Sequence, residues 1–567
     1  MTRSMATSLH SLRGPLAGAA LVALCACGTT GQVPAVPAPA ALQQACPALA
    51  GRQVAAQAIG LPSGAATVSR ATLVAAAGDL PAYCQVLGSI AARTAGADPI
   101  RFQLNLPTRW NGKAVMYGGG GFNGTLTTGT TPLRDAAAGQ PLPLASGYAT
   151  FGTDSGHDAT AYNATDPGRF ALNDEMFENF AHASYKKVKD VAHVLLRGFY
   201  QQPPARQYFY GGSEGGREGL MLAQRYPADF DGIVSAVPVI HWTGLFNGFL
   251  AFTQPQFTGG ALNAAKVRLV ADAVNNACDA LDGLADGVVS NYLACPQRFR
   301  LDSLRCPDGA DTGSSCLSDP QLATLQAAYG PIQMPFALAH GVTSYPGRLF
   351  GGEIQMGSEG IARWVSSGQV PAVPTPRASD ARGVNYGSSY ARYVIARDAG
   401  FDVRTFDANR FAARIRAVSE LMDATDPDLS AFLRRGGKLL VRENAGDMAQ
   451  SAMAGMLYYQ SVVARMGQAE VDRFMRLYVS PASNHAGAAA SLTTGEEVPT
   501  HHDMLDTLDR WVEGTAPADA LVQVRNAPDA PYATVASRPL CRYPRYPQYV
   551  GGDARSAASY RCAVSAP

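Results

Sequence analysis

The sequence predicts an α/β domain with a mostly parallel sheet, interrupted by a long insertion. Strand-like and helix-like segments alternate before residue 238 and again after residue 428, and this alternation is typical of α/β domains. Residues 238–428 have weak strand signals and are rich in Gly, Pro and aromatic residues. We therefore expect one α/β domain built from residues 46–237 and 429–567, with residues 238–428 as a second domain.

The individual elements follow from the spacing of apolar side chains. Residues 100–106 alternate apolar and polar side chains, as in a half-buried strand, and residues 176–200 repeat apolar side chains with helical period. The predicted strands are 100–106, 114–117, 208–210, 438–441 and 474–479, and the predicted helices are 176–200, 215–225 and 504–512.

The composition is that of an ordinary globular protein. The chain has 567 residues, 47% of them hydrophobic, and its 46 basic and 45 acidic residues give a formal charge of +1. The apolar content is too high, and the net charge too low, for a chain that stays disordered. Because no basic cluster occurs, no nucleic-acid partner is expected.

Residues 1–27 have the pattern of an export signal. Arg3 and Arg13 supply positive charge, and the apolar run 16–26 is too short to span a bilayer as a stable helix. The run ends in Leu-Cys-Ala-Cys-Gly, which resembles a bacterial lipobox with Cys27 as the lipidated residue. Simple cleavage and a retained anchor are the alternatives, so we expect a periplasmic protein, an outer-membrane lipoprotein anchored at Cys27, or a secreted protein. Residues 28–45, rich in Ala and Pro, are predicted to be a flexible tether.

Eight cysteines follow this leader, an even number that suits disulfide bonds in an oxidising compartment. Zinc is disfavoured because no CxxC spacing occurs. Eight cysteines allow 105 pairings, so the connectivity is open. Pairing in sequence order would join Cys46 to Cys84, Cys278 to Cys295, Cys306 to Cys316 and Cys541 to Cys562.

Ser213 lies in the pattern G-x-S-x-G, formed by residues 211–215. A predicted strand precedes the pattern and a predicted helix follows it, which is the context of a nucleophile elbow. The hydroxyl would then stand at a helix N-terminus, where the backbone N–H of Glu214 can stabilise an oxyanion. The alternative is a glycine-rich turn with an incidental serine.

A serine nucleophile needs a base, which follows it along the chain after an elbow of this kind. His485 lies in a loop directly after the predicted strand 474–479. We therefore predict His485 as the base. His501 and His502, which directly precede a predicted helix, are the alternative.

The base needs an acid to orient it, and the acid should follow the preceding strand. Asp447 lies in the loop after the predicted strand 438–441. We predict Asp447 as the acid, with Glu443 as its competitor.

A second oxyanion donor is expected from the glycine-rich turn 118–124, which follows the predicted strand 114–117. A flexible turn without a function is the alternative. No phosphate-loop lysine follows these glycines, so nucleotide binding is not expected.

Asp279, Asp282 and Asp286 lie within eight residues of one loop. Carboxylates and main-chain carbonyls are the oxygen ligands that Ca²⁺ prefers. The spacing is not that of an EF-hand, and a solvated acidic turn is the alternative.

Together these motifs resemble the tannase and feruloyl esterase family, most closely its mono(2-hydroxyethyl) terephthalate (MHET) hydrolases. The resemblance covers most of the chain after Cys46. It is carried by Gly118-Gly-Gly-Gly-Phe-Asn-Gly124, Thr153-Asp-Ser-Gly-His-Asp158, Gly211-Gly-Ser-Glu-Gly-Gly-Arg-Glu-Gly219, Cys278-Asp-Ala-Leu-Asp-Gly-Leu-Ala-Asp-Gly287, Asn484-His485 and Arg538-Pro-Leu-Cys-Arg-Tyr-Pro544.

The resemblance implies an α/β-hydrolase fold in which residues 238–428 form a lid. It assigns a catalytic triad to Ser213, Asp447 and His485, and oxyanion donors to the N–H groups of Glu214 and Gly121. It also implies a structural Ca²⁺ in the lid and no organic cofactor. The implied calcium ligands are Asp279, Asp282 and Asp286, with the carbonyls of Leu284 and Val288.

The family usually has bridged cysteines just before the nucleophile and just after the catalytic histidine. Here these positions are Gly212 and Ala486. We therefore expect packing alone to hold the elbow and the histidine loop together. A Gly212→Cys/Ala486→Cys variant should form the bridge if the two loops are correctly aligned.

The resemblance also suggests residues that bind substrate. Arg382 matches an arginine that binds a substrate carboxylate, although a surface arginine is the alternative. Tyr386 matches a phenylalanine of the MHET hydrolases that packs on the substrate ring. Gln450 replaces an aromatic residue that lies just after the catalytic acid in those enzymes.

We therefore expect an exported, monomeric serine esterase that acts on small esters of aromatic acids. Hydroxycinnamate esters, gallate esters and MHET are the competing substrates. A non-catalytic, calcium-stabilised binding protein on the same scaffold is the rival from another class.

Overall fold

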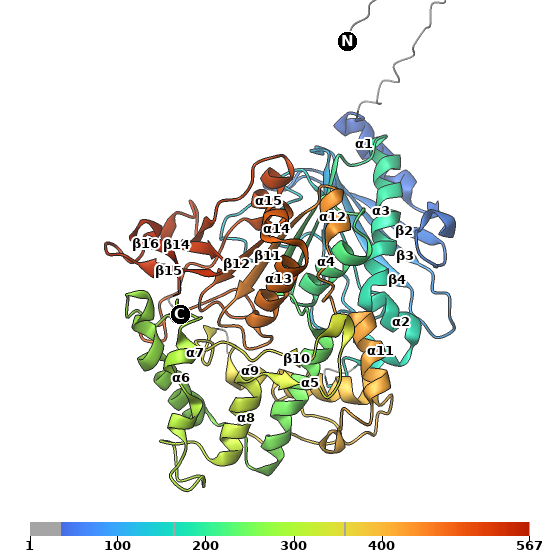
Figure 1. Ribbon diagram of the computed structural model, residues 1–567. Helices are drawn as coiled ribbons and strands as arrows, with labels where there is room; N and C mark the ends of the chain where they lie inside the picture. The colour runs from blue at the N-terminus through green and yellow to red at the C-terminus, as the bar shows by residue number, and fades with distance from the viewer. Residues whose placement is uncertain (1–35, 163–164, 357–358, 566–567) are drawn as a thin grey trace, which may run out of the picture. The chain divides into compact units, whose positions relative to one another are not determined.

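A twelve-stranded sheet lies at the centre of the fold in the computed structural model, which describes residues 36–162, 165–356 and 359–565 (Figure 1). Its middle strands run parallel to one another. In spatial order they are β6 (Ala149–Thr153), β5 (Lys113–Tyr117), β7 (Arg206–Gly212), β8 (Gly232–Ala236), β11 (Lys438–Asn444) and β12 (Met475–Ser480). The carboxyl ends of these strands meet at one edge of the sheet, so the loops that follow β7, β11 and β12 come together there.

The outer strands are antiparallel, so the expectation of a mostly parallel sheet holds only for its middle. Short connections join most of these strands to their neighbours, and such connections suit antiparallel pairs, whereas parallel strands need long crossovers. The outer strands are β1 (Gln53–Val54), β2 (Ala66–Val74), β3 (Tyr83–Ile90) and β4 (Ile100–Pro107) on one side, and β14 (Thr534–Arg542) and β13 (Ala520–Asn526) on the other.

Helices pack against the sheet through apolar faces. Helix α3 (Ser184–Tyr200) buries Val188 and Leu195 in the main core, while α15 (Met504–Val512) packs Leu508 and Trp511 in a separate cluster with strand residues. The predicted helix 176–200 is divided, because a π-helical turn at Asn179–Ala183 separates α3 from α2 (Asp174–Glu178). The other helices beside the sheet include α4 (Glu214–Arg225), α12 (Ser430–Arg434), α13 (Ala452–Met466) and α14 (Gln468–Phe474).

The segment between β8 and β11 is largely helical and contributes most of a second hydrophobic core, to which residues before β7 and after β11 also belong. Figure 1 shows its helices, in green to orange, gathered at one end of the sheet. They include α5 (Trp242–Thr253), α6 (Ala264–Cys278), α7 (Cys295–Arg298), α8 (Asp319–Tyr329), α9 (Ile361–Trp364), α10 (Arg382–Ser389) and α11 (Ala412–Met422), with a small hairpin of β9 (Ile332–Gln333) and β10 (Ser344–Tyr345). Among the described residues, no helix is long and apolar enough to cross a membrane.

The predicted tether is too long at its C-terminal end. Residues Pro39–Ala45 form helix α1, and Leu42 is buried in the main core. An apolar side chain in this short Ala-rich segment therefore attaches it to the folded body. The predicted signal, with Cys27, lies outside the described residues.

Four disulfides join the cysteines in sequence order. Cys46–Cys84 ties the segment after α1 to β3, and Cys541–Cys562 ties β14 to β16 (Tyr560–Val564), which pairs with β15 (Arg545–Tyr549). The other two bridges lie in the helical insertion.

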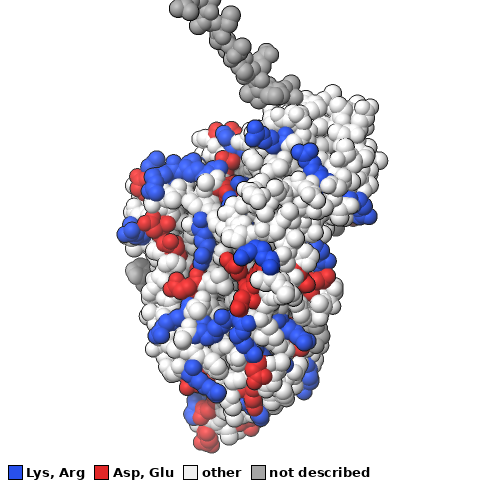
Figure 2. Space-filling model, turned by 90° about the vertical axis from the view of Figure 1, so that its right-hand side faces the viewer, with Lys and Arg blue, Asp and Glu red and all other residues white. Residues whose placement is uncertain are grey.

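On the face shown in Figure 2, acidic and basic side chains are interspersed.

Candidate active site

Ser213 occupies a sharp turn between β7 and α4. Its backbone has φ 62° and ψ −122°, which is a strained conformation for a residue with a side chain. The Ser213 N–H donates to the Ala236 carbonyl at the end of the neighbouring strand β8 (2.9 Å). The turn is therefore held by the sheet itself, and the Ser213 side chain stands at the start of α4.

The turn is tight enough to require glycine at position 211. A Cβ atom on Gly211 would overlap the backbone of Gly215 in the first turn of α4. Strand β7 and helix α4 therefore approach each other as closely as main chains allow, which explains the glycine before the turn and the one after it.

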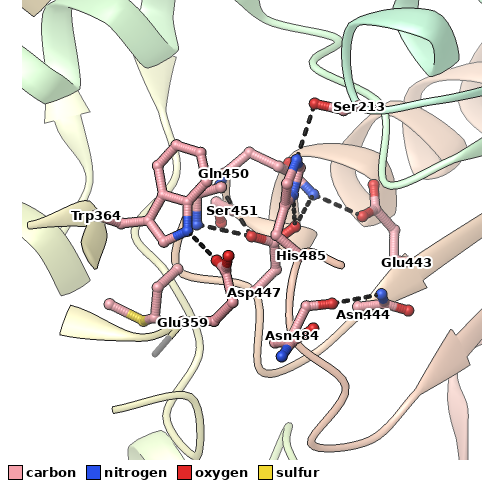
Figure 3. Close-up of polar contacts among 12 residues, drawn as sticks. Ser213, Glu359, Trp364, Glu443, Asn444, Asp447, Gln450, Ser451, Asn484 and His485 are labelled. Atoms are coloured by element: carbon pink, nitrogen blue, oxygen red, sulfur yellow. Dashed lines mark hydrogen bonds and ion pairs between the residues drawn. The ribbon is translucent and has the colours of Figure 1, made fainter. Parts of the chain in front are cut away.

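A continuous hydrogen-bond relay joins three side chains from three loops (Figure 3). His485 Nε2 lies 2.8 Å from Ser213 Oγ, and His485 Nδ1 lies 2.6 Å from Asp447 Oδ2. The structure thus brings together the three residues predicted as nucleophile, base and acid, with His485 within hydrogen-bond distance of the other two. Neither alternative base belongs to this relay. His502 Nδ1 contacts the Val522 carbonyl, and His501 Nδ1 is buried without a hydrogen bond from any described residue.

Asp447 is held rigidly below the imidazole. Its Oδ1 accepts the N–H groups of Ala449 (2.7 Å) and Gln450 (3.1 Å), and only 1% of the residue is exposed. The Gln450 amide donates to the competing acid Glu443 (2.8 Å) and lies 3.4 Å from Asp447 Oδ2. Burial raises the pKa of Glu443 well above its usual range, and the nearby Asp447 adds to this rise. Glu443 therefore lies behind the relay rather than in it.

The two predicted oxyanion donors, Glu214 and Gly121, line a pocket that also contains Ser213. Within the described residues, neither N–H makes a hydrogen bond. The Glu214 side chain turns away to the buried Arg217, whose Nε donates to it (2.8 Å). The backbone N–H of Glu214 is therefore left available at the N-terminus of α4.

Glu218, one turn further along α4, fixes the glycine-rich turn. Its carboxylate accepts the Gly119 N–H (3.0 Å) and the Asn123 side-chain amide (2.6 Å). Burial, followed by the charge of Glu214, raises the pKa of Glu218 above its usual value. The elbow helix and the turn that carries Gly121 therefore form one hydrogen-bonded unit.

An aromatic pocket of about 350 Å³, including space open to solvent, adjoins the Ser213 hydroxyl. Helix α5 contributes four side chains to the wall, and α9, α10 and the loop after β11 contribute others. The Trp364 ring meets the His485 ring edge to face at 5.5 Å. The lining includes Trp242, Leu245, Phe246, Phe249, Trp364, Tyr386, Ala449 and Gln450.

The residues suggested to bind substrate lie in different places. Tyr386 and Gln450 line the pocket, but Arg382 does not; it is exposed, with its guanidinium 5.6 Å from the centre of the Trp364 ring. Sequence reasoning missed Trp242 and Trp364. The apolar run in α5 was the available signal for the first, whereas nothing local marked the second.

The expectation that packing alone joins the elbow to the histidine loop is wrong. Arg134 Nη1 donates a hydrogen bond to the His485 carbonyl. A Cβ atom on Gly212 would overlap the same guanidinium group, so Arg134 fills the space beside the nucleophile. A polar side chain from a remote loop therefore makes this connection.

The acidic loop does not gather its carboxylates into one cluster. Asp279 accepts the N–H groups of residues 286–288 at 2.9–3.1 Å, and Asp286 Oδ2 pairs with Arg538 at 2.6 Å. No group of three or more His, Cys, Asp or Glu side chains that could hold a metal ion occurs in the described parts of the chain.

Several oxygens of this loop nevertheless lack partners. Asp282 Oδ2 and Asp286 Oδ1 are buried without a hydrogen bond from any described residue. The carbonyls of Leu284 and Val288 likewise accept none within the described ranges. Buried oxygens without donors fit a bound cation, because an unpaired buried polar group is costly.

Comparison with known proteins shows the family to which this chain belongs. Residues 84–563 match the family described as tannase and feruloyl esterase. The chain belongs to the tannase and feruloyl esterase family. It is a carboxylic ester hydrolase.

Three relatives match most of the chain. An uncharacterized esterase of Agrobacterium fabrum is 36% identical over 91% of this chain and 93% of its own length. The mono(2-hydroxyethyl) terephthalate hydrolase of Piscinibacter sakaiensis is 30% identical over 87% of each chain. A probable feruloyl esterase of Arthroderma benhamiae is 32% identical over 81% of each.

Solved structures of this family share the fold. Feruloyl esterase B from Aspergillus oryzae superposes with a TM-score of 0.72 at 23% identity, covering 92% of this chain and all of its own. The fold of this esterase is therefore of the α/β-hydrolase type, with its lid inserted between β8 and β11.

The close approach at Gly211 predicts that Gly211→Ala lowers the free energy of unfolding by more than about 2 kcal/mol, because the added methyl group has no space. Gly198→Ala in α3 is the matched control. There the nearest atom would lie 3.6 Å from the Cβ, so we expect a gain of about 0.5–1 kcal/mol from helix propensity. Thermal and denaturant unfolding measure both changes, and equal stability of the two variants would contradict the tight turn.

Proposed function

We propose that this protein is an exported serine esterase that hydrolyses esters of aromatic acids through an acyl-enzyme on Ser213. The observation that carries the proposal is the Ser213–His485–Asp447 relay, with contacts of 2.8 and 2.6 Å, beside a pocket with aromatic walls. The four disulfides support export, because such bridges persist in oxidising compartments.

His485 acts first as a base and then as an acid. Its Nε2 accepts the Ser213 proton as the oxygen attacks the ester carbonyl, and it returns the proton to the leaving alcohol. A water molecule activated in the same way then releases the acid. Asp447 accepts a hydrogen bond from Nδ1–H, which fixes the tautomer and stabilises the charged imidazole.

The backbone N–H groups of Glu214 and Gly121 stabilise the negative charge on the tetrahedral intermediate. Both are presented to the pocket without another acceptor in the described structure. Glu218 holds the turn that carries Gly121 in place, so the donors need no rearrangement as the charge develops.

The pocket favours an aromatic acyl group. Trp242, Phe246 and Tyr386 provide flat apolar surfaces against which a ring can pack. Arg382, exposed above the Trp364 ring, offers a positive charge for a substrate with a second carboxylate. We therefore favour an MHET-like ester over neutral feruloyl and galloyl esters.

We also propose that the acidic loop of the lid binds Ca²⁺. Its ligands would be the carboxylates of Asp279, Asp282 and Asp286 and the carbonyls of Leu284 and Val288. The unpartnered oxygens of this loop support the assignment. The ion would stabilise the lid and takes no part in the reaction at Ser213.

The relay predicts that Ser213→Ala reduces ester hydrolysis to background, and that Asp447→Asn lowers kcat by about 10⁴-fold because the imidazole loses its orienting acceptor. Hydrolysis of p-nitrophenyl acetate and labelling by a fluorophosphonate check this. Ser461→Ala, on α13 and outside the pocket, is the control. Labelling of the Ser213→Ala variant at the wild-type rate would show that another residue is the reactive nucleophile. A wild-type protein that is neither labelled nor able to hydrolyse the ester would instead support a binding protein without catalysis.

The position of Arg382 predicts that Arg382→Ala raises KM for MHET by about tenfold, since a hydrogen bond to a charged group is lost. KM for methyl ferulate and methyl gallate should stay unchanged. Release of the free acid from all three esters is the measurement. An equal rise in KM for all three esters would show that Arg382 acts on the pocket wall and not on a substrate carboxylate.

Calcium binding predicts that removal of divalent ions lowers the melting temperature, and that added Ca²⁺ restores it, because a ligand of the folded state stabilises that state. Asp282→Asn should abolish this response. Asp272→Asn, at an exposed pair with Arg268 on α6, should retain it. A melting temperature of the wild type that is indifferent to Ca²⁺ would contradict the site.

A further inference from the structure

Arg134 connects two loops that both carry groups of the relay. It lies between β5 and β6, far along the chain from either loop. Its Nη1 donates to the main-chain carbonyl of His485, and its Nε lies against Gly212, the residue before Ser213. One guanidinium group therefore touches the main chain next to the nucleophile and the main chain of the base.

The backbone around Arg134 is itself fixed at several points. The Tyr210 hydroxyl donates to the Arg134 carbonyl (2.7 Å), and the His502 N–H donates to the Asp135 carbonyl (3.1 Å). The Asp135 carboxylate pairs with Arg442 at 3.3 Å, and both side chains are fully buried. Asp135 adopts φ 68°, a left-handed conformation that such contacts must hold in place.

Few contacts from outside position the main chain of the histidine loop. Among the described residues, its two central carbonyls at Asn484 and His485 accept outside hydrogen bonds from two side chains only, Asn444 and Arg134. Asn444 donates to the Asn484 carbonyl from the end of β11 (2.7 Å), as Figure 3 shows. Arg134 supplies the second point, from the side of the elbow.

We propose that Arg134 is a positioning residue that ties the nucleophile elbow to the His485 loop. The inference rests on the proposed triad and deepens it. Two points of attachment, one on each side, fix both the height and the direction of the imidazole over Ser213. Without Arg134, the loop can move away from the elbow while Asn444 still holds its other end.

The first test replaces Arg134 by Met, which keeps a long apolar stem against Gly212 and removes the donors. We expect kcat for p-nitrophenyl acetate to fall about 10- to 100-fold with KM within about threefold, because the reacting atoms are misplaced while the pocket is unchanged. Arg510→Ala, at an exposed pair on α15, should leave kcat unchanged. A wild-type kcat in folded Arg134→Met would overturn the proposal.

The second test restores the connection by another chemistry. In Arg134→Ala/Gly212→Cys/Ala486→Cys, the space left by the guanidinium should let the two cysteines pair. We expect oxidation to raise kcat at least tenfold, and mild reductant to reverse this. Wild type and Arg134→Ala under the same reductant control for the four native bridges. A closed bridge, verified by mass spectrometry, without recovery of kcat would overturn the proposal.

The third arm separates this proposal from the esterase proposal. With Arg134 retained, Gly212→Cys/Ala486→Cys should keep two free thiols, because the guanidinium occupies the space beside Gly212. The structure thus reverses the expectation from the sequence that this pair of cysteines would form a bridge. Pairing that is equally fast with and without Arg134 would refute its assigned position, whatever the activity. Ester hydrolysis that Ser213→Ala does not reduce would instead refute the esterase proposal.

Discussion

The contact between Ser213 and His485 is the constraint on which the rest of the site depends. The two residues lie 272 positions apart, and a reaction at the serine needs them within hydrogen-bond distance in a fixed direction. The parallel middle of the sheet brings the ends of β7, β11 and β12 to one edge. Side chains at that edge, among them Asn444 and Arg134, add hydrogen bonds to the main chain of the His485 loop.

Buried charges supply much of this placement. Arg217 with Glu214, Arg442 with Asp135, and Glu218 with the glycine-rich turn each lie within or beside the catalytic edge of the sheet. A buried charge is costly unless it is paired and hydrogen bonded. Each of these groups therefore has one favourable geometry, and this makes them precise anchors even where they add little to the stability of the fold.

The lid has a different role, because its contribution is mostly apolar. The second hydrophobic core, which the lid shares with residues such as Phe122 and Met448, supports α5, α9 and α10. These helices present aromatic rings towards Ser213. Arg217 also reaches the lid, where it donates to the Met422 carbonyl (3.1 Å) at the end of α11. The elbow helix and the lid thus share a buried contact, so the pocket wall has a defined position over the nucleophile.

The sequence by itself determined the middle of the sheet and the three residues that the structure joins at its edge. Strand and helix periodicity marked the middle of the sheet, and the elbow motif with two strand-end loops marked Ser213, Asp447 and His485, because these signals are local. The antiparallel flanks, the exposed place of Arg382, the aromatic wall with Trp364 and the Arg134 connection were decided only by the tertiary structure. Each of these depends on which distant side chains meet, and neither periodicity nor motif spacing records how a remote loop fills the space beside a glycine.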